Sequence, residues 1–446
     1  MEVLPEDRVV VLGGSMAGLL AARVLADAYA EVVVVDRDKI VGVTTARRGV
    51  PQGRHVHGLL ARGQQVLEEL FPGFTDDAIA AGVPTGDLGE LRWFFNGQRL
   101  RKGTTGLICV STDRPVLEGM VRARVAALPN VRFVESTDVV GLVATPDAAR
   151  ITGVRVSEHA GDGTEEVIEA GLVVDATGRG SRTPVWLEEL GYQRPETEKV
   201  PIDLTYTTRH FRLRDESILD GDLSINPVST PAQPRGAFFS RVGHGRCIVS
   251  LTGVLGDAAA PDDESFMEWT RTLPVSDVYD VIHDAEPLDD PVSFKYPASV
   301  RRRYDLLERF PERLLVVGDA MCSFNPVYGQ GMTVAALEAL ALRTHLESGV
   351  PEPLVFFKDI SAVIDVPWQI SAGADLDFAE VPGPRPPELQ MMNSYMSLLQ
   401  SAATRDGEVT RTFMRVAGLV DPPTALMSPD MIYRVLKHGT PRPQAA

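Results

Sequence analysis

The first 35 residues alternate between short apolar runs and a longer, alanine-rich segment. Residues 9–12 read Val-Val-Val-Leu, a glycine-rich turn follows, the alanine-rich segment extends to Ala30, and valines return at 32–35. Short β-branched runs beside glycine are typical of buried strands, and the longer segment between them predicts a helix. The order strand, turn, helix, strand predicts a βαβ unit with parallel strands.

The turn between the first strand and the helix reads Gly13-Gly14-Ser15-Met16-Ala17-Gly18. Backbone N–H groups in such a turn, together with the positive end of the helix, suit a pyrophosphate. Ser15 stands where the G-x-G-x-x-G pattern has its second glycine, and serine is small and carries its own donor. Asp36 ends the second strand, 18 residues after Gly18, and is predicted to hold a ribose hydroxyl. The alternative is a βαβ unit with a glycine turn and no ligand.

The pattern along the remaining chain predicts three kinds of region. Alternating strands dominate residues 200–300, helical segments follow Val350, and a buried strand and a glycine-bracketed helix near 313–346 resemble the N-terminal region. We therefore predict an α/β fold. A Rossmann-like domain comprises residues 1–90, 111–199 and 301–350, an antiparallel β-sheet substrate domain is inserted at 200–300 with strands contributed by 91–110, and 351–446 form a helical C-terminal region.

Composition excludes several classes of function. The 446 residues carry a net charge of −17, which disfavours nucleic acid and anionic membrane surfaces as partners. The basic run Arg301–Arg303 is predicted to be a solvated face, with phosphate binding as the alternative. The three cysteines lack a C-x-x-C spacing, which fits a reducing compartment. No apolar run is long enough for a transmembrane segment and no signal peptide is expected, so we predict a cytoplasmic protein.

A second glycine-rich region supplies further candidate chemistry. A predicted strand ends in Gly318-Asp319, and Gly329-Gln330-Gly331 opens the next helix. A carboxylate at a strand end can hold a ribityl or ribose hydroxyl, and a helix N-terminus can stabilise negative charge on a flavin ring. With the first turn, these residues indicate an extended FAD. The pair His55-x-His57 lacks further ligands nearby, so no metal is predicted.

On these motifs the sequence resembles the FAD-dependent monooxygenases of the para-hydroxybenzoate hydroxylase type, over residues 5–350. Gly318-Asp319-Ala320 matches the Gly-Asp motif of that family, and Arg47 and Arg114 match arginines that approach the FAD phosphates. Ser15, the loop 51–57 and the run 325–333 look most like bacterial polyether-type epoxidases, which are similar to squalene epoxidases. The FAD-binding residues are then expected to be Gly13, Gly14, Ser15, Ala17, Gly18, Asp36, Arg37, Arg47, Arg48, Arg114, Val139, Asp319, Pro326, Gly329, Gly331 and Met332.

The resemblance implies a reaction as well as a cofactor. A C4a-hydroperoxyflavin would insert one oxygen atom from O₂, with the flavin C4a as the reacting centre and no side chain as nucleophile. Epoxidation of an alkene in an apolar secondary metabolite is favoured. Hydroxylation of an aromatic ring and a non-oxygenating flavin reductase or dehydrogenase are the alternatives. Aromatic residues of the inserted sheet are candidates for the pocket wall, each with sheet core as the alternative: Tyr206, Phe238, Phe239 and Phe294.

The third motif of the family is altered in this chain. Thr177 and Pro184 stand where many members have an aspartate and an arginine that help couple FAD to NAD(P)H. We therefore expect NAD(P)H to act as the electron source through a separate flavin reductase. The alternative is that other residues bind the nicotinamide transiently.

Overall fold

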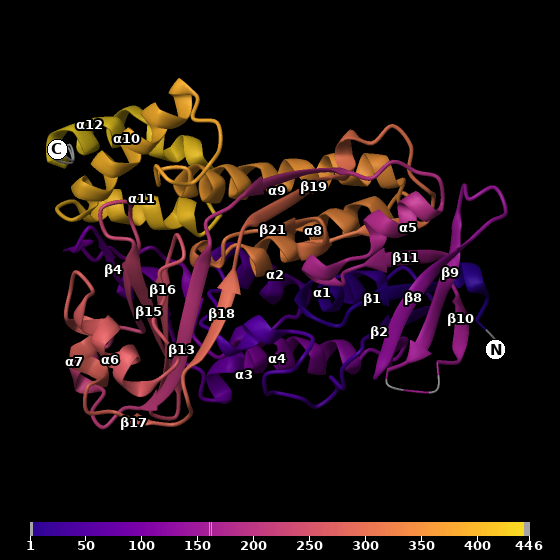
Figure 1. The fold of residues 1–446 in the computed structure, drawn as a ribbon, viewed down its shortest axis with the longest axis horizontal. Coiled ribbons are helices and arrows are strands. Elements are labelled where there is room, and N and C mark those ends of the chain that lie inside the picture. Colours follow the sequence, from indigo (N-terminus) through magenta and orange to yellow (C-terminus); the bar gives the residue numbers. More distant parts are fainter. Residues whose placement is uncertain (1–2, 160, 162, 441–446) are drawn as a thin grey trace.

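The structure, a computed structural model, describes residues 3–159, 161 and 163–440. A parallel sheet with its helices forms one half of the molecule, and an antiparallel sheet forms the other (Figure 1). The last three helices lie above the antiparallel sheet, and the N-terminus is at the opposite end of the long axis. The α/β class expected from the sequence is confirmed.

The parallel sheet has the strand order β20-β11-β1-β2-β7, and every neighbouring pair is parallel. Apart from the edge strand β7, its valine-rich strands are buried on both faces, which is typical of parallel sheets. Val9 and Val11 face one layer of helices, whereas Val10 and Leu12 face a smaller sheet. The strands are β1 (Arg8–Leu12), β2 (Glu31–Val35), β7 (Val131–Val134), β11 (Leu172–Asp175) and β20 (Leu314–Val316).

Different layers cover the two faces of this sheet. Residues of four helices share a core with Val9 and Val11, namely α1 (Met16–Leu25), α2 (Ala61–Leu70), α4 (Arg114–Ala126) and α8 (Gly331–Leu346). The other face packs on a three-stranded antiparallel sheet of β8 (Thr137–Ala144), β9 (Ile151–Glu158) and β10 (Glu165–Glu169).

The second large sheet is antiparallel except where β14 meets β4. Most strands come from residues 204–296, and two from residues 92–99 extend its edge. One face packs against α6 (Asp263–Arg271) and α7 (Asp277–Ile282), so the opposite face is left for other contacts. The strands are β4 (Arg92–Phe95), β5 (Gln98–Arg99), β13 (Leu204–Arg212), β14 (Ser224–Val228), β15 (Arg235–Gly243), β16 (Arg246–Gly253), β17 (Glu286–Pro287) and β18 (Val292–Tyr296).

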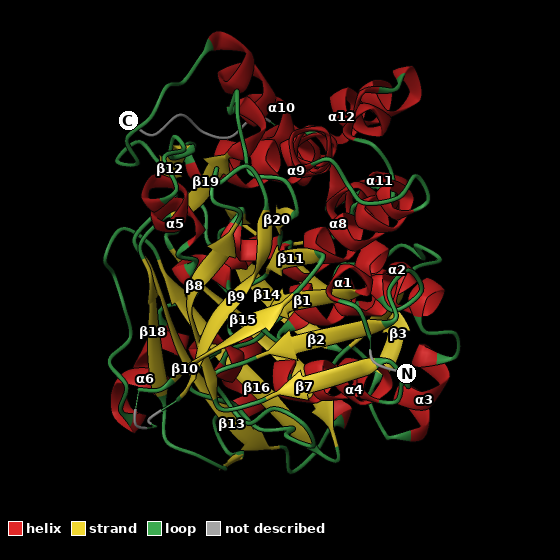
Figure 2. Cartoon of the chain, turned by 90° about the vertical axis from the view of Figure 1, so that its right-hand side faces the viewer, coloured by secondary structure: helices red, strands yellow, loops and turns green. Residues whose placement is uncertain are grey.

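The last three helices gather at one end of the molecule (Figure 1), and in Figure 2 they lie with the long helix that precedes them in the upper part of the view. The long α9 (Pro353–Asp375) crosses towards this end, and α10 (Pro387–Ala403), α11 (Gly407–Ala417) and α12 (Pro429–His438) follow. The core of α10, α11 and α12 includes Leu399, Val409 and Met414, and it reaches Leu100 beside the antiparallel sheet. The helices therefore close over the free face of that sheet.

Smaller elements join these layers. A three-stranded sheet, ordered β12-β19-β21, lies between the two halves, and β3 pairs with β6. No helix in the described part of the chain is long and apolar enough to cross a membrane. The remaining elements are α3 (Phe74–Ala80), α5 (Thr183–Glu189), β3 (Thr85–Asp87), β6 (Ile108–Val110), β12 (Glu196–Val200), β19 (Ser299–Arg303) and β21 (Cys322–Ser323).

Candidate FAD site and adjoining pocket

A cavity of about 830 Å³ lies at the carboxyl ends of the parallel strands. Gly13 follows β1, Asp36 follows β2, Thr177 lies just past β11, and Asp319 lies just past β20, and all four line this cavity. Ligands of parallel α/β sheets bind in crevices outside these strand ends. We call this space the glycine-turn cavity.

The glycine turn leaves no space for side chains inside it. Gly13 has a φ of +95°, and a Cβ there would lie 2.6 Å from the carbonyl oxygen of Ala176. A Cβ on Gly18 would lie 1.8 Å from the carbonyl oxygen of Gly13. Ser15 is the N-cap residue of α1, but its hydroxyl does not cap the helix. The first N–H groups of α1 are therefore left for an anion in the cavity.

Asp36 is held against the turn by backbone donors. The N–H of Gly14 donates to Oδ2 at 2.8 Å, and the N–H of Asp38 donates to Oδ1 at 2.9 Å. Arg47 approaches Oδ1 at 3.3 Å. The carboxylate is 7% exposed and lines the cavity, so its orientation is fixed while it retains capacity to accept a hydroxyl.

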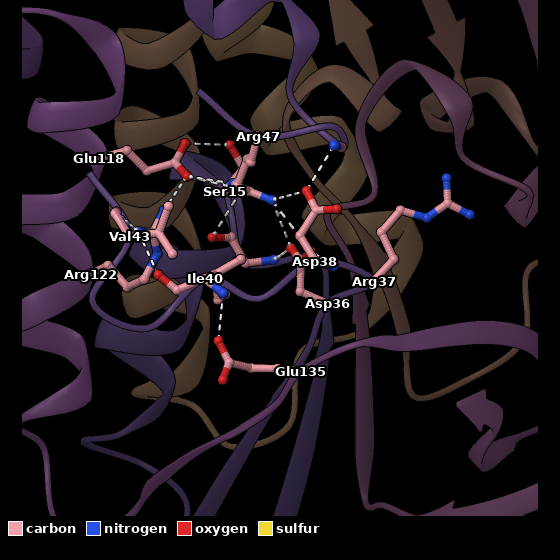
Figure 3. Close-up of polar contacts among 12 residues, drawn as sticks. Ser15, Asp36, Arg37, Asp38, Ile40, Val43, Arg47, Glu118, Arg122 and Glu135 are labelled. Carbon is pink, nitrogen blue, oxygen red and sulfur yellow. Dashed lines mark hydrogen bonds and ion pairs between the residues drawn. The ribbon is translucent and has the colours of Figure 1, made fainter. Parts of the chain in front are cut away.

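Buried Glu118 gathers the arginines near the turn (Figure 3). It accepts hydrogen bonds from Ser15 Oγ at 2.8 Å, Arg47 Nη2 at 2.9 Å, Arg114 Nη2 at 2.8 Å, and from Arg122. Burial alone would raise the pKa of the Glu118 carboxyl, but Arg114 and Arg47 outweigh it and lower the pKa to about 2. The glutamate therefore stays ionised and holds Arg47 and Arg114 at the cavity wall.

Another part of the cavity wall is formed by Asp319 and the start of α8. In the part of the chain that the structure describes, no hydrogen-bond donor reaches the Asp319 carboxylate, and burial raises its pKa. A Cβ added to Gly331 would meet only Asp319 Oδ1, at 3.7 Å. Gln330 is the N-cap residue of α8, and its side chain accepts no hydrogen bond from the first turn of the helix. The first N–H groups of α8 are therefore not capped by this side chain.

Most of the residues predicted from the sequence line this one cavity. They are Gly13, Ser15, Ala17, Asp36, Arg37, Arg47, Arg114, Val139, Asp319, Pro326, Gly329, Gly331 and Met332. Gly14 and Gly18 shape the turn from behind it, and Arg48 is not among the lining residues. The Arg37 side chain points away from the Glu118 cluster (Figure 3) and pairs with Asp138, another lining residue, at 2.8 Å.

Three arginines that were not predicted to bind the cofactor also line the cavity. Arg179 and Arg182 follow β11, and Arg302 comes from β19. Thr177 donates its hydroxyl to the buried Asp175 rather than facing a partner in the cavity. The presence of Arg179 and Arg182 beside Thr177 was a signal in the sequence, since both lie within the altered third motif.

The prediction that Arg301–Arg303 form a solvated face was wrong. Arg301 is 3% exposed and donates to Ser361 Oγ at 2.6 Å and to Asp365 Oδ1 at 2.7 Å, both on α9. Arg302 donates to the carbonyl of Ala320 at 2.7 Å and lines the glycine-turn cavity. These arginines join β19 to α9 and to the cavity wall, because partners distant in sequence satisfy their charges and donors.

A second cavity, of about 470 Å³, lies between the free face of the antiparallel sheet and the C-terminal helices. We call it the apolar pocket. Its sheet side includes Trp93, Phe95 and Phe238, and its helix side includes Leu389, Met396, Phe413 and Leu426. Met392 and Met427 also line it and are 45% and 44% exposed, so the pocket reaches the surface there.

The four aromatic candidates separate into different environments. Tyr206 and Phe238 line the apolar pocket. Phe294 lines the glycine-turn cavity and packs against His55, with ring centroids 5.5 Å apart. Phe239 is fully buried on the other face of the sheet, against α6 and α7, and lines neither cavity, so its assignment to the pocket wall is corrected. Successive residues of a strand point to opposite faces.

The two cavities meet at a short wall. The residues common to both linings are His55, Val56, His57, Gly58, Tyr206, Pro326 and Gly329. His55 Nδ1 lies 2.7 Å from Thr208 Oγ1, and His57 Nδ1 lies 2.9 Å from the carbonyl of His55. Burial lowers the pKa of His55 to about 4 and of His57 to about 3, so both are neutral at pH 7. The described residues contain no group of three or more potential metal ligands.

The donors and acceptors of the glycine-turn cavity fit FAD. The tight turn and the start of α1 suit the pyrophosphate, Asp36 suits the adenosine ribose, and the unpartnered Asp319 carboxylate suits a hydroxyl of the ribityl chain. The uncapped start of α8 suits a ring that gains negative charge. The wall shared with the apolar pocket includes Pro326 and Gly329, which immediately precede this helix start.

Comparisons with known proteins agree with this site. A family model described as FAD dependent oxidoreductase matches residues 8–183. The chain is 34% identical over 459 residues to Protein Rv3254 of Mycobacterium tuberculosis, covering 98% of this chain and 94% of that protein. Its fold is similar to a flavoprotein/dehydrogenase from Cytophaga hutchinsonii, with a TM-score of 0.67, 16% identity and 96% of each chain covered.

The fold is also similar to p-nitrophenol 4-monooxygenase PnpA from Pseudomonas putida, with a TM-score of 0.65, 16% identity, and coverage of 93% of this chain and 98% of that one. Both structural likenesses extend over both sheets and the C-terminal helices, because they cover nearly the whole chain. The full-length likeness shows that the chain belongs to the same family as Protein Rv3254, and its residues 8–183 match the FAD dependent oxidoreductase model.

Proposed function

We propose that this protein is a FAD-dependent monooxygenase that transfers one oxygen atom from O₂ to an apolar small molecule. The observation that carries the proposal is the junction of the two cavities at His55–Gly58, Tyr206, Pro326 and Gly329. A substrate in the apolar pocket would meet the cofactor at this junction. A long apolar pocket against the redox-active end of a cofactor supports oxygenation of the substrate rather than electron transfer alone.

The chain's own residues would bind and orient both reactants. Asp36, the glycine turn and Asp319 would hold FAD in an extended form, with Arg47 and Arg114 beside the phosphates. Bound FAD would supply the activation of O₂. The aromatic and aliphatic walls of the apolar pocket would exclude water from the junction of the two cavities. Exclusion of water protects reactive intermediates from side reactions.

Within this class, epoxidation of an alkene in an apolar secondary metabolite is our first choice. The apolar lining from Trp93, Phe95, Phe238 and Phe413 supports an apolar substrate. Hydroxylation of an aromatic ring is the alternative, and a non-oxygenating reductase or dehydrogenase is the third possibility. The neutral His55 and His57 beside the junction are compatible with either oxygenation.

Labelled dioxygen tests this proposal. FAD-loaded protein is reduced, incubated with a panel of alkenes and phenols under ¹⁸O₂, and the products are analysed by mass spectrometry. Incorporation of one labelled atom into an alkene supports epoxidation, and incorporation into a phenol supports hydroxylation. Reoxidation of the flavin without labelled product across the panel, in protein that binds panel members, would support the non-oxygenating alternative instead.

We propose further that electrons from NAD(P)H arrive through a separate flavin reductase. The reason is that Thr177 and Pro184 replace the acid and arginine of the third motif. Anaerobic stopped-flow reduction, followed at the flavin absorbance band, should be slow with NADPH or NADH alone and fast after a flavin reductase is added. Fast, saturable reduction by NADPH alone would contradict this, and would point to Arg179 and Arg182 as nicotinamide-nucleotide ligands.

A further inference from the structure

A buried carboxyl group lies behind the apolar pocket, at the end of α9. Asp375 is 1% exposed, and its Oδ1 accepts hydrogen bonds from Asn325 Nδ2 at 2.8 Å and from Tyr328 OH at 3.0 Å. Its Oδ2 is buried and has no hydrogen-bond partner among the described residues. Nor does any described arginine, lysine or histidine form an ion pair with Asp375.

This arrangement is costly if its only role is structural. A buried carboxylate without a cation loses its hydration, and no ion pair compensates for that loss. In a purely structural position we would therefore expect a protonated acid or an amide side chain. Burial raises the pKa of Asp375 to about 7, although Asn325 and Tyr328 act in the opposite direction. The group can therefore change its protonation state near neutral pH.

Tyr328 connects this carboxyl group to the pocket. It lines the apolar pocket between Pro326 and Gly329, two residues of the wall shared with the glycine-turn cavity. The titratable groups facing the pair are Tyr206 from β13 and Asp377, which lies just beyond α9. The pKa of Tyr206 and that of Tyr328 are both raised by burial, so both phenols stay protonated.

We propose that Tyr328 and Asp375 form a proton-delivery pair for the oxygen reaction, with Tyr328 as the catalytic donor and Asp375 as the residue that reprotonates it. The inference rests on the proposed monooxygenase function. The overall reaction, substrate + O₂ + NAD(P)H + H⁺ → oxygenated substrate + NAD(P)⁺ + H₂O, consumes one proton at the junction. The hydrogen bond from Tyr328 OH to Oδ1 belongs to the ionised Asp375. When Asp375 is protonated this bond reverses, so that Asp375 donates to the Tyr328 oxygen, and Tyr328 releases its own proton into the pocket and takes the proton of Asp375. Asp375 then regains a proton from solvent.

The same proton demand exists without substrate. Reoxidation of a reduced, anionic flavin by O₂ takes up one proton and releases oxidised flavin and H₂O₂. Proton delivery can therefore be measured before the substrate is known, by mixing anaerobically photoreduced, FAD-loaded protein with O₂ in weak buffer containing a pH indicator. Flavin absorbance and proton uptake are recorded together from pH 5 to 9.

The expected result for the wild-type protein is a rate that falls as pH rises through about 7. In Asp375→Asn the rate at pH 6 should fall at least about tenfold and lose this pH dependence, since acid–base groups typically contribute about 10²–10⁴-fold. Tyr328→Phe should behave alike, and the double variant should be no slower than the slower single variant. Asp359→Asn, an exposed change on the same helix, should follow the wild-type profile.

A second measurement is independent of turnover. Infrared difference spectra of the resting, FAD-loaded protein between pH 5 and 9 should show a protonated carboxyl band that titrates near 7. Asp375→Asn should lack this band, and Asp359→Asn should keep it. A spectrum in which Asp375→Asn leaves every titrating carboxyl band in place would overturn the assignment of Asp375 as the proton store.

The outcomes separate this inference from the proposed function. If both substitutions leave the pH profile of proton uptake unchanged while labelled product forms, the proton-delivery pair is wrong and the monooxygenase stands. If proton uptake depends on Asp375 but no substrate in the panel gains labelled oxygen, the pair stands and the oxygenation is wrong. A uniform loss of rate in Asp375→Asn with an unaltered pH profile would show a structural role only, and would also overturn the proposal.

Discussion

The glycine-turn cavity and the apolar pocket are built on different principles. The first is lined by residues that follow neighbouring parallel strands, such as Gly13, Asp36 and Asp319, and fixed charges and backbone donors surround it. The second lies between one face of an antiparallel sheet and the C-terminal helices, and its walls are apolar. The first strand of that sheet begins at Arg92, whereas helix α11 ends at Ala417. Local motifs encode the first cavity, whereas long-range packing creates the second.

The largest expected effect comes from two neighbouring residues of β15. Phe239→Ala removes a fully buried ring from the core beneath α6 and α7 and should lower the free energy of unfolding by about 3–5 kcal/mol. Phe238→Ala removes a ring from the wall of the apolar pocket and should lower the free energy of unfolding clearly less than Phe239→Ala does. Chemical denaturation of both variants measures the difference. Equal losses would mean that Phe238 is core rather than pocket wall.

FAD affinity should depend on the glycine-turn cavity alone. Asp36→Ala and Asp319→Ala each remove a carboxylate that is expected to hold a cofactor hydroxyl, which costs about 1.5–3 kcal/mol, or roughly 10- to 150-fold in affinity. Phe238→Ala serves as the control and should leave FAD affinity within about twofold. Fluorescence titration with FAD measures all three. Unchanged affinity in both aspartate variants would contradict their assignment.

The buried acid beneath the cofactor cavity should produce a pH-dependent difference in stability. Glu338 on α8 accepts the N–H of Gly318 at 2.6 Å, and burial raises its pKa from 4.5 to about 8. The pKa of Glu338 is higher in the folded than in the unfolded state, so its protonation stabilises the fold fully below pH 4.5. This stabilisation is lost as the pH rises from 4.5 to 8. Relative to wild type, Glu338→Gln should therefore gain stability between pH 6 and 7, by at most about 1.4 kcal/mol. Thermal unfolding at several pH values measures this gain, and a constant difference would exclude titration of Glu338.

The smallest expected effect concerns the start of α8. In Gly331→Val the added side chain projects towards Asp319 and the cavity, and should hold a flavin ring away from the helix N-terminus. Helix-end charge effects of about 0.3–1 kcal/mol correspond to a reduction potential lower by roughly 6–20 mV for a two-electron couple. Spectroelectrochemical titration of flavin-loaded protein measures it. An unchanged reduction potential would show that the N-terminus of α8 does not stabilise charge on the flavin.

The contrast between the cavities also explains what the sequence could predict. The βαβ unit, Asp36 and the Gly318-Asp319 turn were readable because strand, turn and helix signals lie within a few residues of each other. The α/β class followed from them. The faces of β15 were not readable, since Phe238 and Phe239 are adjacent aromatic residues and only the packing of α6 and α7 decides which one is core.

Partners distant in sequence account for the remaining differences. Arg301 looked solvated because its partners, Ser361 and Asp365, lie 60 or more residues later. Asp375 gave no signal, because its contacts with Asn325 and Tyr328 arise only when α9 packs beside the loop before α8. The sequence predicted a helical C-terminal region. It did not predict that α9 continues through Pro367 and forms part of the wall of the apolar pocket.

The position of the C-terminal helices has an evolutionary consequence. Leu389, Met396, Phe413 and Leu426 shape the outer pocket, and none of them lines the glycine-turn cavity. Substitutions of these residues can alter the substrate specificity without changing the binding of the cofactor, so selection can act on the two cavities separately. Relatives that share the N-terminal motifs are therefore expected to diverge fastest along α10 and α11, and their substrate ranges should diverge with them.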